Sequence, residues 1–261
     1  MTPSAGRPAV LVTGMSGLIG SALRARLGNR YDLRALNRRA IPGVPCHQAD
    51  IADLEAIGPA LAGVETVVHL AAAVGNPRFD EVLRVNVIGT YNVFEASRRA
   101  GVKRVVYASS GATVSAWERE PPYSLLAAGR YDDVSDWPIM THETPVRPSG
   151  LYGCSKVWGE ALARHYADAH GLSMICVRIG HVTAADRPVA SRDFSVWCSQ
   201  RDIAQMIERC VAAPPSVRFD VFYGVSRNRW GYRDLGHARA VVGYEPEDAA
   251  ENFRGKEPSR R

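Results

Sequence analysis

The sequence predicts an α/β fold with a doubly wound parallel sheet, and three observations support this prediction. Short apolar runs alternate with longer amphipathic stretches along the first 180 residues. The apolar runs are rich in β-branched residues, which is typical of strands that are buried on both faces. A glycine-rich turn joins the first apolar run to the first amphipathic stretch. Ligands of such sheets bind outside the carboxyl ends of the strands, so the residues after each strand are candidates for a functional site.

The expected elements follow in chain order. Strands are expected near 8–13, 32–36, 66–70, 104–108 and 173–178, and helices near 17–27, 53–62, 79–100 and 153–170. After residue 181 the pattern weakens to a helix near 202–213 and an isolated strand-like run at 218–223. We therefore predict a main domain over 1–180, a small substrate-binding lobe over 181–253 packed on it, and a flexible tail over 254–261. Residues 115–148 contain several prolines and little periodicity, and a loop of that length is usually functional or mobile.

Composition excludes several classes of protein. The chain has 261 residues, 46% of them apolar and 23% charged, which suits one large globular domain. No run approaches the ~20 apolar residues that span a membrane, and the first residues do not resemble a secretory signal. The five cysteines form no Cys-x-x-Cys pair, so we expect reduced thiols, a cytoplasmic location and no metal site.

The net charge of +5 invites a nucleic-acid interpretation, which the distribution of the charge does not favour. Only three of the 32 basic residues are lysines, and the arginines are spread along the whole chain. Nucleic-acid-binding proteins usually gather basic residues on one face or arm. We expect a small-molecule substrate and no nucleic-acid partner.

Three glycines follow the first expected strand with the spacing Gly-x-x-Gly-x-x-Gly: Gly14, Gly17 and Gly20. A dinucleotide site of the Rossmann type needs such a turn, because the backbone must approach a pyrophosphate at a helix N-terminus. The turn also contains Ser16, Leu18 and Ile19, which would contact the same ligand. A glycine turn without a ligand is the alternative, but the flanking strand and helix make it less favoured.

The residues after the second strand bear on the choice between NAD and NADP. A carboxylate at this position favours NAD, whereas this chain has Asn37 and Arg38, followed by Arg39. Guanidinium groups suit a 2′-phosphate, so NADP is preferred over NAD, although these arginines can equally be solvated surface residues. Asp50, followed by Ile51, is expected near the adenine amino group.

Tyr152 and Lys156 lie four residues apart and would share one face of a helix. A free tyrosine titrates near pH ~10 and is a poor base at neutral pH. A neighbouring ammonium, together with an oxidised nicotinamide, would favour the phenolate and make Tyr152 an acid or base for catalysis. The bare Tyr-x-x-x-Lys pattern is common, and only its position after the fourth main strand makes it informative.

These motifs occur in a fixed order with His69-Leu70-Ala71-Ala72, Asn86-Val87-Ile88-Gly89-Thr90 and Ala108-Ser109-Ser110 between them. Together they resemble the extended short-chain dehydrogenase/reductase superfamily, the NAD(P)-dependent epimerases and dehydratases, over nearly the whole chain. The segments Leu151–Glu160, Val177–Gly180 and Arg192–Trp197 look more specifically like the uronate dehydrogenases, which oxidise the anomeric carbon of a hexuronic acid to a lactone with NAD.

The resemblance implies roles for individual residues. Tyr152, Lys156 and Ser110 would be catalytic, and Arg192 falls where that family's arginine grips the substrate carboxylate. A structural arginine on the lobe surface is the alternative for Arg192. Besides the residues named above, the implied cofactor-binding residues are Leu70, Ala71, Ala72, Asn86, Ala108 and Ile179.

The chain departs from the uronate dehydrogenases at positions that contact substrate. Gly111 and Ala112 replace an Asn-His pair, and Val74 and His181 each replace a serine. Because a site that loses such donors cannot recognise the same hydroxyls, uronate itself is not assigned as the substrate. The hydroxyl that orients the substrate is expected to come from Ser110, from Thr113 or from a water.

The leading hypothesis is hydride transfer between NAD(P) and a hydroxyl or carbonyl of a small, anionic, sugar-like substrate whose carboxylate, sulfonate or phosphate Arg192 holds. A sugar-nucleotide epimerase is the second hypothesis, and a cofactor-binding regulator without turnover is the third. By analogy with the family, the helices near 79–100 and 153–170 would form a homodimer interface.

Overall fold

Seven parallel strands form one sheet in the order β3-β2-β1-β4-β5-β6-β7 in the computed structural model, which describes residues 6–255. The strands are β1 (Ala9–Thr13), β2 (Asp32–Asn37), β3 (Cys46–Gln48), β4 (Thr66–His69), β5 (Arg104–Ser110), β6 (Ser173–Ile179) and β7 (Phe219–Gly224). The order reverses between β1 and β4, which is the topological switch point of a doubly wound sheet. The predicted Rossmann-type fold is confirmed.

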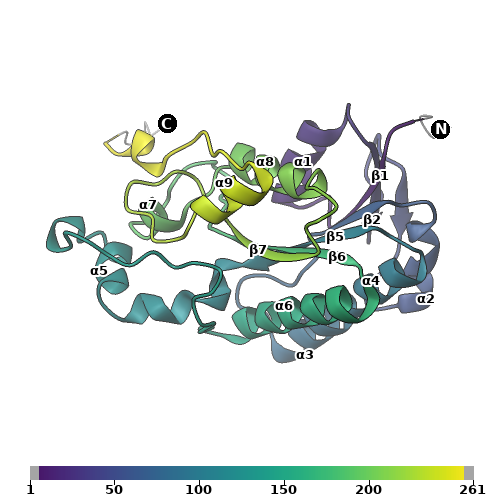
Figure 1. Ribbon diagram of the computed structural model, residues 1–261, viewed down its shortest axis with the longest axis horizontal. Coiled ribbons are helices and arrows are strands. Elements are labelled where there is room, and N and C mark those ends of the chain that lie inside the picture. Colours follow the sequence, from purple (N-terminus) through teal and green to yellow (C-terminus); the bar gives the residue numbers. More distant parts are fainter. Residues whose placement is uncertain (1–5, 256–261) are drawn as a thin grey trace.

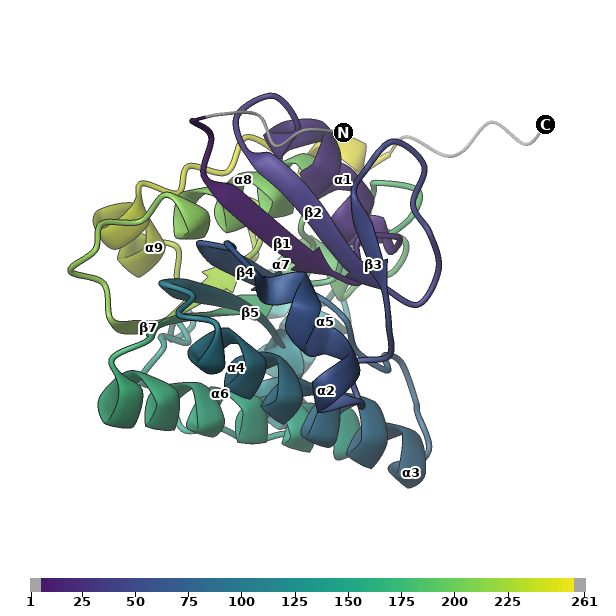
Figure 2. The same cartoon turned by 90° about the vertical axis from the view of Figure 1, so that its right-hand side faces the viewer.

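Helices cover both faces of the sheet (Figures 1 and 2). One face carries α1 (Leu18–Leu27), α8 (Gln200–Val211) and α9 (Gly236–Val242), and the other carries α2 (Leu54–Ile57), η1 (Gly58–Leu61), α4 (Gly89–Arg99) and α6 (Leu151–His170). Successive β1 residues alternate between the two cores, since Val10 and Val12 face α1 and Leu11 faces the α4 side. Within residues 6–255, no helix has both the length and the apolar character needed to cross a bilayer.

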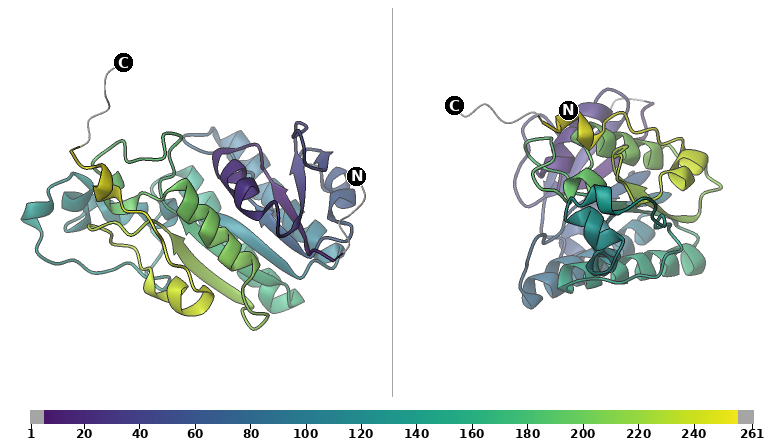
Figure 3. Two further views of the ribbon diagram at one scale, coloured as in Figure 1. Left: turned by 90° about the horizontal axis from the view of Figure 1, so that it is seen from above. Right: turned by 90° about the vertical axis from the view of Figure 1, so that its left-hand side faces the viewer.

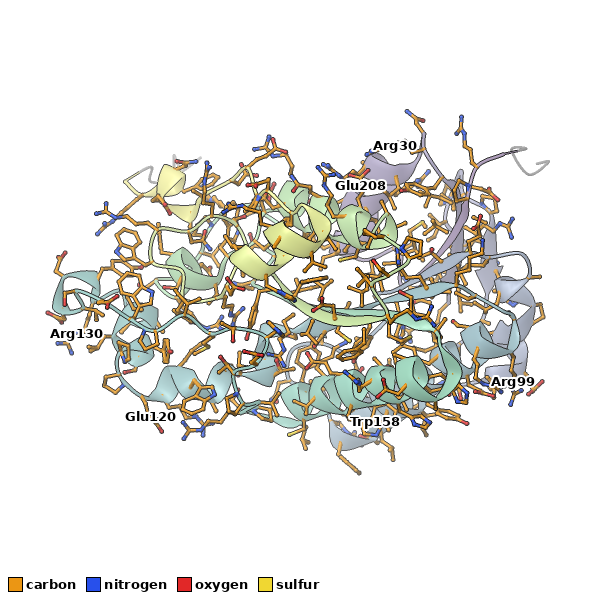
Figure 4. The ribbon with its side chains drawn as sticks, in the orientation of Figure 1. Arg30, Arg99, Glu120, Arg130, Trp158 and Glu208 are labelled. Atoms are coloured by element: carbon orange, nitrogen blue, oxygen red, sulfur yellow. The ribbon has the colours of Figure 1, made fainter. Side chains whose placement is uncertain are left out.

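The predicted boundary at residue 180 does not coincide with the edge of the sheet. β7 pairs in parallel with β6, and α8 packs against α1. Glu208 of α8 bonds to Arg26 of α1 at 2.5 Å and also pairs with Arg30 (Figure 4). The strand-like run at 218–223, predicted as isolated, therefore extends the main sheet.

The lobe over one end of the sheet is built from two distant segments (Figures 1 and 3). The predicted loop 115–148 contains η4 (Ser115–Arg119), α5 (Tyr123–Ala127) and η5 (Tyr131–Asp133), and it packs with α7 (Asp193–Val196) and residues 223–235 around a shared apolar cluster. The backbone N–H of Met140 donates to the carbonyl of Tyr232 at 2.7 Å. Residues 115–148 therefore pack as an integral part of the lobe.

Four short elements complete the described chain: α3 (Phe79–Glu81), the π-helical stretch η2 (Val82–Ile88), η3 (Gly111–Thr113) and η6 (Ala250–Phe253). The first two continue into α4, so the long helix predicted near 79–100 is a single winding segment with a π-helical middle. Of the tail predicted at 254–261, residues 256–261 lie outside the described residues.

Candidate active site

The glycine turn lies at the switch point, between the carboxyl ends of β1 and β4. Gly14 has φ +69°, and a Cβ on it would lie 2.9 Å from the backbone of Ala71, in the loop after β4. A Cβ on Gly20 would overlap the backbone of Met15. Ser16, Gly17 and Leu18 are exposed at the start of α1, so their surface is accessible to a ligand. The turn fits a dinucleotide pyrophosphate because the backbone is tightly folded and the helix N-terminus is open.

A buried hydrogen-bond network supports this turn from below. The Thr13 hydroxyl lies 2.7 Å from Nδ1 of His69 and accepts from the backbone N–H of Ala71 at 3.1 Å. Nε2 of His69 lies 3.1 Å from the Thr90 hydroxyl. Burial lowers the pKa of His69 to about 3, with a smaller contribution from Lys156, so this histidine is neutral at physiological pH.

The end of β2 carries the residues that would meet the adenosine. The Asn37 amide accepts from Ser16 at 3.2 Å and donates to the carbonyl of Arg39 at 2.9 Å, while Arg38 is exposed. The Asp50 carboxylate is half-buried and pairs with Arg84 at 2.6 Å. Burial would raise the pKa of Asp50, but the N–H of Ala52 and the charges of Arg84 and Arg38 outweigh it and lower the pKa.

Tyr152 and Lys156 occupy the first turns of α6, beneath the carboxyl end of β5. The Lys156 ammonium is buried, donates to the carbonyl of Ala108 at 2.7 Å and lies 5.6 Å from the ring centroid of Tyr152. Ser110 ends β5, and its hydroxyl acts on the phenol through a hydrogen bond that favours the ionised form. The structure thus brings together the three residues predicted to be catalytic.

The pKa values in the protein alone differ from the predicted tuning. Burial raises the pKa of Tyr152, and the hydrogen bond from Ser110 offsets only part of this effect. Burial lowers the pKa of Lys156 to about 7, although Cys176 and Glu160 act in the opposite direction. Burial is the dominant influence on both groups in the chain alone, and the lowering of the tyrosine pKa expected with a bound, oxidised nicotinamide stays a prediction.

Asn86 links the loop after β4 to α6 through side-chain hydrogen bonds. Its amide donates to the carbonyl of Ala73 at 3.0 Å and to the Ser155 hydroxyl at 3.1 Å, and it accepts from the N–H of Ala73 at 2.8 Å. Asn86 is fully buried, so its position fixes the loop after β4, which also contains Leu70, Ala71 and Ala72. This role is structural support for the loop rather than an exposed contact.

Ile51 and Ile19 are placed mainly by packing. A Cβ on Gly89 would lie 2.6 Å from Cδ1 of Ile51, so this side chain fills the space between the loop after β3 and the start of α4. Ile19 packs partly buried against the core beneath α1. Both residues hold the walls of the candidate cofactor site in place.

A cavity of about 560 Å³ opens beside Ser110, between the sheet and the lobe. Six of the residues predicted to bind substrate or cofactor line it: Ser110, Gly111, Ala112, Ile179, His181 and Arg192. The remaining lining residues are Ser115, Glu118, Arg119, Ser149, Gly180 and Arg233. Its size suits a small, sugar-like molecule.

Glu118 connects two arginines in the wall of this cavity. Its carboxylate accepts from Nε of Arg192 at 2.5 Å and from Nη2 at 2.9 Å, and Nη2 of Arg233 lies 3.4 Å away. Burial alone would raise the pKa of Glu118, but the hydrogen bonds from Arg192 and the charge of Arg233 hold it below its usual range. Arg192 therefore lines the cavity, and two of its N–H groups already donate to the carboxylate of Glu118.

His181 lies at the rim of the cavity and is oriented by an aspartate. Its Nδ1 lies 2.6 Å from Oδ1 of Asp193, and Oδ2 of the same carboxylate accepts from the backbone N–H groups of Val189 and Ala190 at 2.8 and 3.1 Å. Burial would raise the pKa of Asp193, yet the hydrogen bond with His181 and the N–H groups lower it. The ionised carboxylate fixes one nitrogen of the imidazole, and the other remains for a ligand.

Three residues predicted to bind substrate do not line the cavity: Tyr152, which lies beside Ser110 on α6, Thr113 and Val74. Thr113 is fully buried, and its hydroxyl donates to the carbonyl of Ser110 at 2.9 Å, so it supports η3 and is not available to a substrate oxygen. Val74 is 68% exposed and does not line the cavity, because the loop after β4 directs it to solvent. Ser110 is therefore the hydroxyl that the geometry favours.

Sequence reasoning missed Glu118, Arg119 and Arg233. The first two lie in the aperiodic loop 115–148, and Arg233 follows a stretch without regular pattern near the C-terminus. No spacing rule connects residues 118 and 233, and only the packing of the lobe brings them together. Among residues 6–255, no group of three or more His, Cys, Asp or Glu side chains is arranged to hold a metal.

Comparisons with known proteins agree with this geometry. Residues 10–242 match the NAD dependent epimerase/dehydratase family. The chain belongs to this family. It is 36% identical over 258 residues to the NAD-dependent glucose-6-phosphate dehydrogenase of Haloferax volcanii, covering 94% of this chain and 95% of the relative. It is also 36% identical over 250 residues to a uronate dehydrogenase of Agrobacterium fabrum, covering 94% and 86%.

The structure resembles the crystal structure of uronate dehydrogenase from Agrobacterium tumefaciens, with a TM-score of 0.80, 33% identity and coverage of 97% of this chain and 91% of the other. The predicted superfamily and the predicted class, an NAD(P)-dependent oxidoreductase acting on a sugar-like substrate, are confirmed, and the epimerase hypothesis is less supported. The relatives support dependence on NAD and give no support to the predicted preference for NADP.

Proposed function

We propose that this dehydrogenase oxidises a hydroxyl of a small anionic sugar, with Tyr152 exchanging the proton and the cavity beside Ser110 holding the substrate. The observation that carries the proposal is the cavity wall, in which Ser110 adjoins a group of arginines. Two of its relatives are named as dehydrogenases of glucose 6-phosphate and of uronate, both of which are anionic sugars, and a third is named for L-arabinose, which is neutral.

The candidate cofactor residues fit a nicotinamide dinucleotide. Gly14 and Gly17 leave the backbone open at the start of α1, and Asn37 and Asp50 lie at the ends of the neighbouring strands. When bound, the nicotinamide would supply the acceptor for the hydride. The chain's own groups would bind, orient and deprotonate the substrate.

Tyr152 and Lys156 of α6, together with Ser110 at the end of β5, would carry out the proton transfer. Ser110 would donate a hydrogen bond to the substrate oxygen, and Tyr152 would remove its proton. Burial raises the pKa of Tyr152 and the hydrogen bond from Ser110 lowers it, so the ammonium of Lys156, 5.6 Å from the ring centroid, would add to the stabilisation of the phenolate. Lys156 would act in this way only in its protonated form.

Replacement of the phenol tests the function. Tyr152→Phe should lower kcat by about 10²–10⁴-fold for oxidation of an aldose phosphate or a uronate, followed as NADH formation, while the Kd for NADH changes little. Tyr123→Phe is the matched control, because the Tyr123 hydroxyl only donates to the carbonyl of Pro138 in the lobe. Undiminished turnover by Tyr152→Phe would contradict the proposed chemistry.

The cofactor phosphate is a separate proposal. Arg38 is exposed beside Asp50 and can meet a 2′-phosphate, whereas one relative is named for NAD and another for NAD(P)(+). We propose that NAD is used and that Arg38 lets NADP bind as well. The ratio of kcat/KM for the two cofactors, measured for the native enzyme and for Arg38→Ala, tests this, and an unchanged ratio would reject a role for Arg38.

A homodimer is proposed on the exposed face of α3, η2, α4 and the start of α6. Large apolar side chains gather there, with Phe79, Leu83, Tyr91 and Leu151 each at least 41% exposed. Residues 79, 83 and 91 are spaced by multiples of four along the helical segment, so they form one stripe. Light scattering of the native protein and of Leu83→Glu would test the assembly, since a buried charge should dissociate it.

A further inference from the structure

Gly111 and Arg233 form a second contact in the cavity wall, separate from the ion pair of Arg192. A Cβ on Gly111 would overlap the guanidinium of Arg233, so the absence of a side chain at 111 makes room for this arginine. Gly111 directly follows Ser110, which places the Arg233 charge next to the hydroxyl proposed to orient the substrate. The space left by the missing side chain at Gly111 is thus filled by the Arg233 guanidinium.

The positive charge of Arg233 is buried with few close hydrogen-bond or ion-pair partners. Its side chain is 1% exposed, its Nε has no hydrogen-bond partner among the described residues, and its ion pair with Glu118 is long, at 3.4 Å. A buried guanidinium normally requires closer partners, because desolvation of the charge is costly. The cavity is the open side from which an anion can supply the missing charge.

The residues that line the cavity carry more positive charge than a single substrate carboxylate would neutralise. Arg119, Arg192 and Arg233 line it, and Glu118 is the carboxylate among the lining residues. Arg119 is exposed, and no carboxylate within residues 6–255 forms an ion pair with it. Three guanidiniums against one carboxylate leave two positive charges among the lining residues, and Asp193, whose carboxylate bonds to His181 and also acts on Arg192, lies outside the lining. A uronate brings one negative charge.

We propose that Arg233, with Arg192 and Arg119, forms a subsite for the doubly charged phosphate of a phosphorylated sugar, and that Gly111 is the residue that permits it. A phosphate monoester carries a charge of about −1.5 to −2 at pH 7, which matches the cavity. Guanidinium groups bind phosphate oxygens through paired N–H donors, and several arginines can share one phosphate. The proposal rests on the proposed dehydrogenase function and narrows its substrate class to sugar phosphates.

Binding to the NADH-bound enzyme tests the subsite without turnover. The probes are glucose 6-phosphate, galactose 6-phosphate and mannose 6-phosphate, each compared with its matching uronate by calorimetry. At least one phosphate should bind about tenfold or more tightly than its uronate. Arg233→Met should weaken that phosphate by about tenfold or more and the uronate less, while Arg130→Met, an exposed lobe arginine paired with Asp133, should change neither.

The Gly111 part of the proposal is tested by a double-mutant cycle. Gly111→Ala should weaken phosphate binding in the native background, because its Cβ displaces the guanidinium, and should have little further effect in Arg233→Met. NADH affinity and the melting temperature of each variant report whether it is folded.

Two results would overturn the subsite: uronates that bind as tightly as every phosphate tested, or an Arg233→Met variant with native phosphate affinity. Either result leaves the dehydrogenase function intact, because that function is tested through Tyr152→Phe. If inorganic phosphate and sulfate compete equally well with the sugar phosphate, the subsite recognises a dianion, as proposed. Competition by acetate at similar concentration would instead count against selection by charge.

Discussion

Glu118 and Arg192 form a bidentate ion pair, with Nε–Oε2 at 2.5 Å and Nη2–Oε1 at 2.9 Å, in the wall of the cavity beside Ser110. The two residues come from the loop after β5 and from the start of α7. The pair holds the two segments of the lobe together and neutralises one of the cavity's positive charges. An anionic substrate would therefore compete with, or add to, a carboxylate that is already present.

The substitution Glu118→Gln tests how much this carboxylate contributes to stability as the counter-charge of the two arginines. Loss of the carboxylate leaves Arg192 and Arg233 without their shared counter-charge, so we expect the free enzyme to lose about 1–3 kcal/mol of stability. A bound sugar phosphate should then raise the melting temperature more in the variant than in the native protein, because the ligand replaces the missing charge.

Glu120→Gln is the control for this experiment, since Glu120 forms an exposed pair with Arg147 at 2.7 Å (Figure 4). Exposed pairs of this kind contribute about 0–1 kcal/mol. Equal losses of stability in the two variants, measured by thermal unfolding, would show that the Glu118 bridge has no special importance.

Gly14→Ala tests the close approach at the switch point. The substitution places a Cβ 2.9 Å from the Ala71 backbone, so the two loops must separate and the cofactor site must widen. We expect NADH affinity to fall about tenfold or more, together with a lower melting temperature. Gly63→Ala has a similar φ of +68° with open space around it, and should cost stability without weakening NADH binding. Equal NADH affinities in the two variants would argue against a cofactor role for this turn.

Lys156→Met should separate activity from stability. The folded-state pKa of Lys156 is about 7, against 10.5 for an exposed lysine, so the unfolded chain binds more protons between these values. The native protein should therefore gain stability relative to the variant as pH rises from 7 to 10, by at most ~1.4 kcal/mol per pH unit. The kcat of the variant should fall sharply.

Urea unfolding of both proteins at several pH values measures this difference. Lys103→Met is the control, because Lys103 is exposed and pairs with Glu65. A stability difference between native protein and Lys156→Met that stays constant from pH 7 to 10 would contradict the buried, perturbed amine.

The part of the site that the sequence predicted is the part encoded by local spacing. Gly14, Gly17 and Gly20 occupy one turn, and Tyr152 and Lys156 one helix, so their relative positions follow from backbone geometry alone. The sheet was predictable for the same reason, since each strand is a short, continuous apolar run. The β7 strand was recognised as strand-like but not as part of the sheet, because the weakly patterned segment before it gave no sign of a further crossover.

The cavity wall was only partly predictable. Arg192 was found through resemblance, but its engagement by Glu118 and the position of Arg233 depend on how loop 115–148 packs against residues 223–235. That packing rests on an apolar cluster around Trp230 and Tyr232, contributed by segments without a regular period. Thr113 was misplaced for a related reason: η3 turns its hydroxyl back onto the Ser110 carbonyl, which strand alternation does not predict.

His69 gives a pH dependence that can be measured apart from catalysis. Its folded-state pKa is about 3, whereas the unfolded value is near 6.5, so the unfolded chain binds an extra proton between these values. The stability that His69 contributes is complete above pH ~6.5 and is lost as pH falls toward 3, by at most ~1.4 kcal/mol per pH unit. Between pH 5 and 6.5 ordinary carboxylates remain ionised, and comparison with a His69 variant cancels the contribution of the other six histidines. In this window the free energy of unfolding of His69→Gln should depend less steeply on pH than that of the native protein. Parallel slopes would mean that the fold does not lower the pKa of His69, and that its bonds to Thr13 and Thr90 do not require the neutral form.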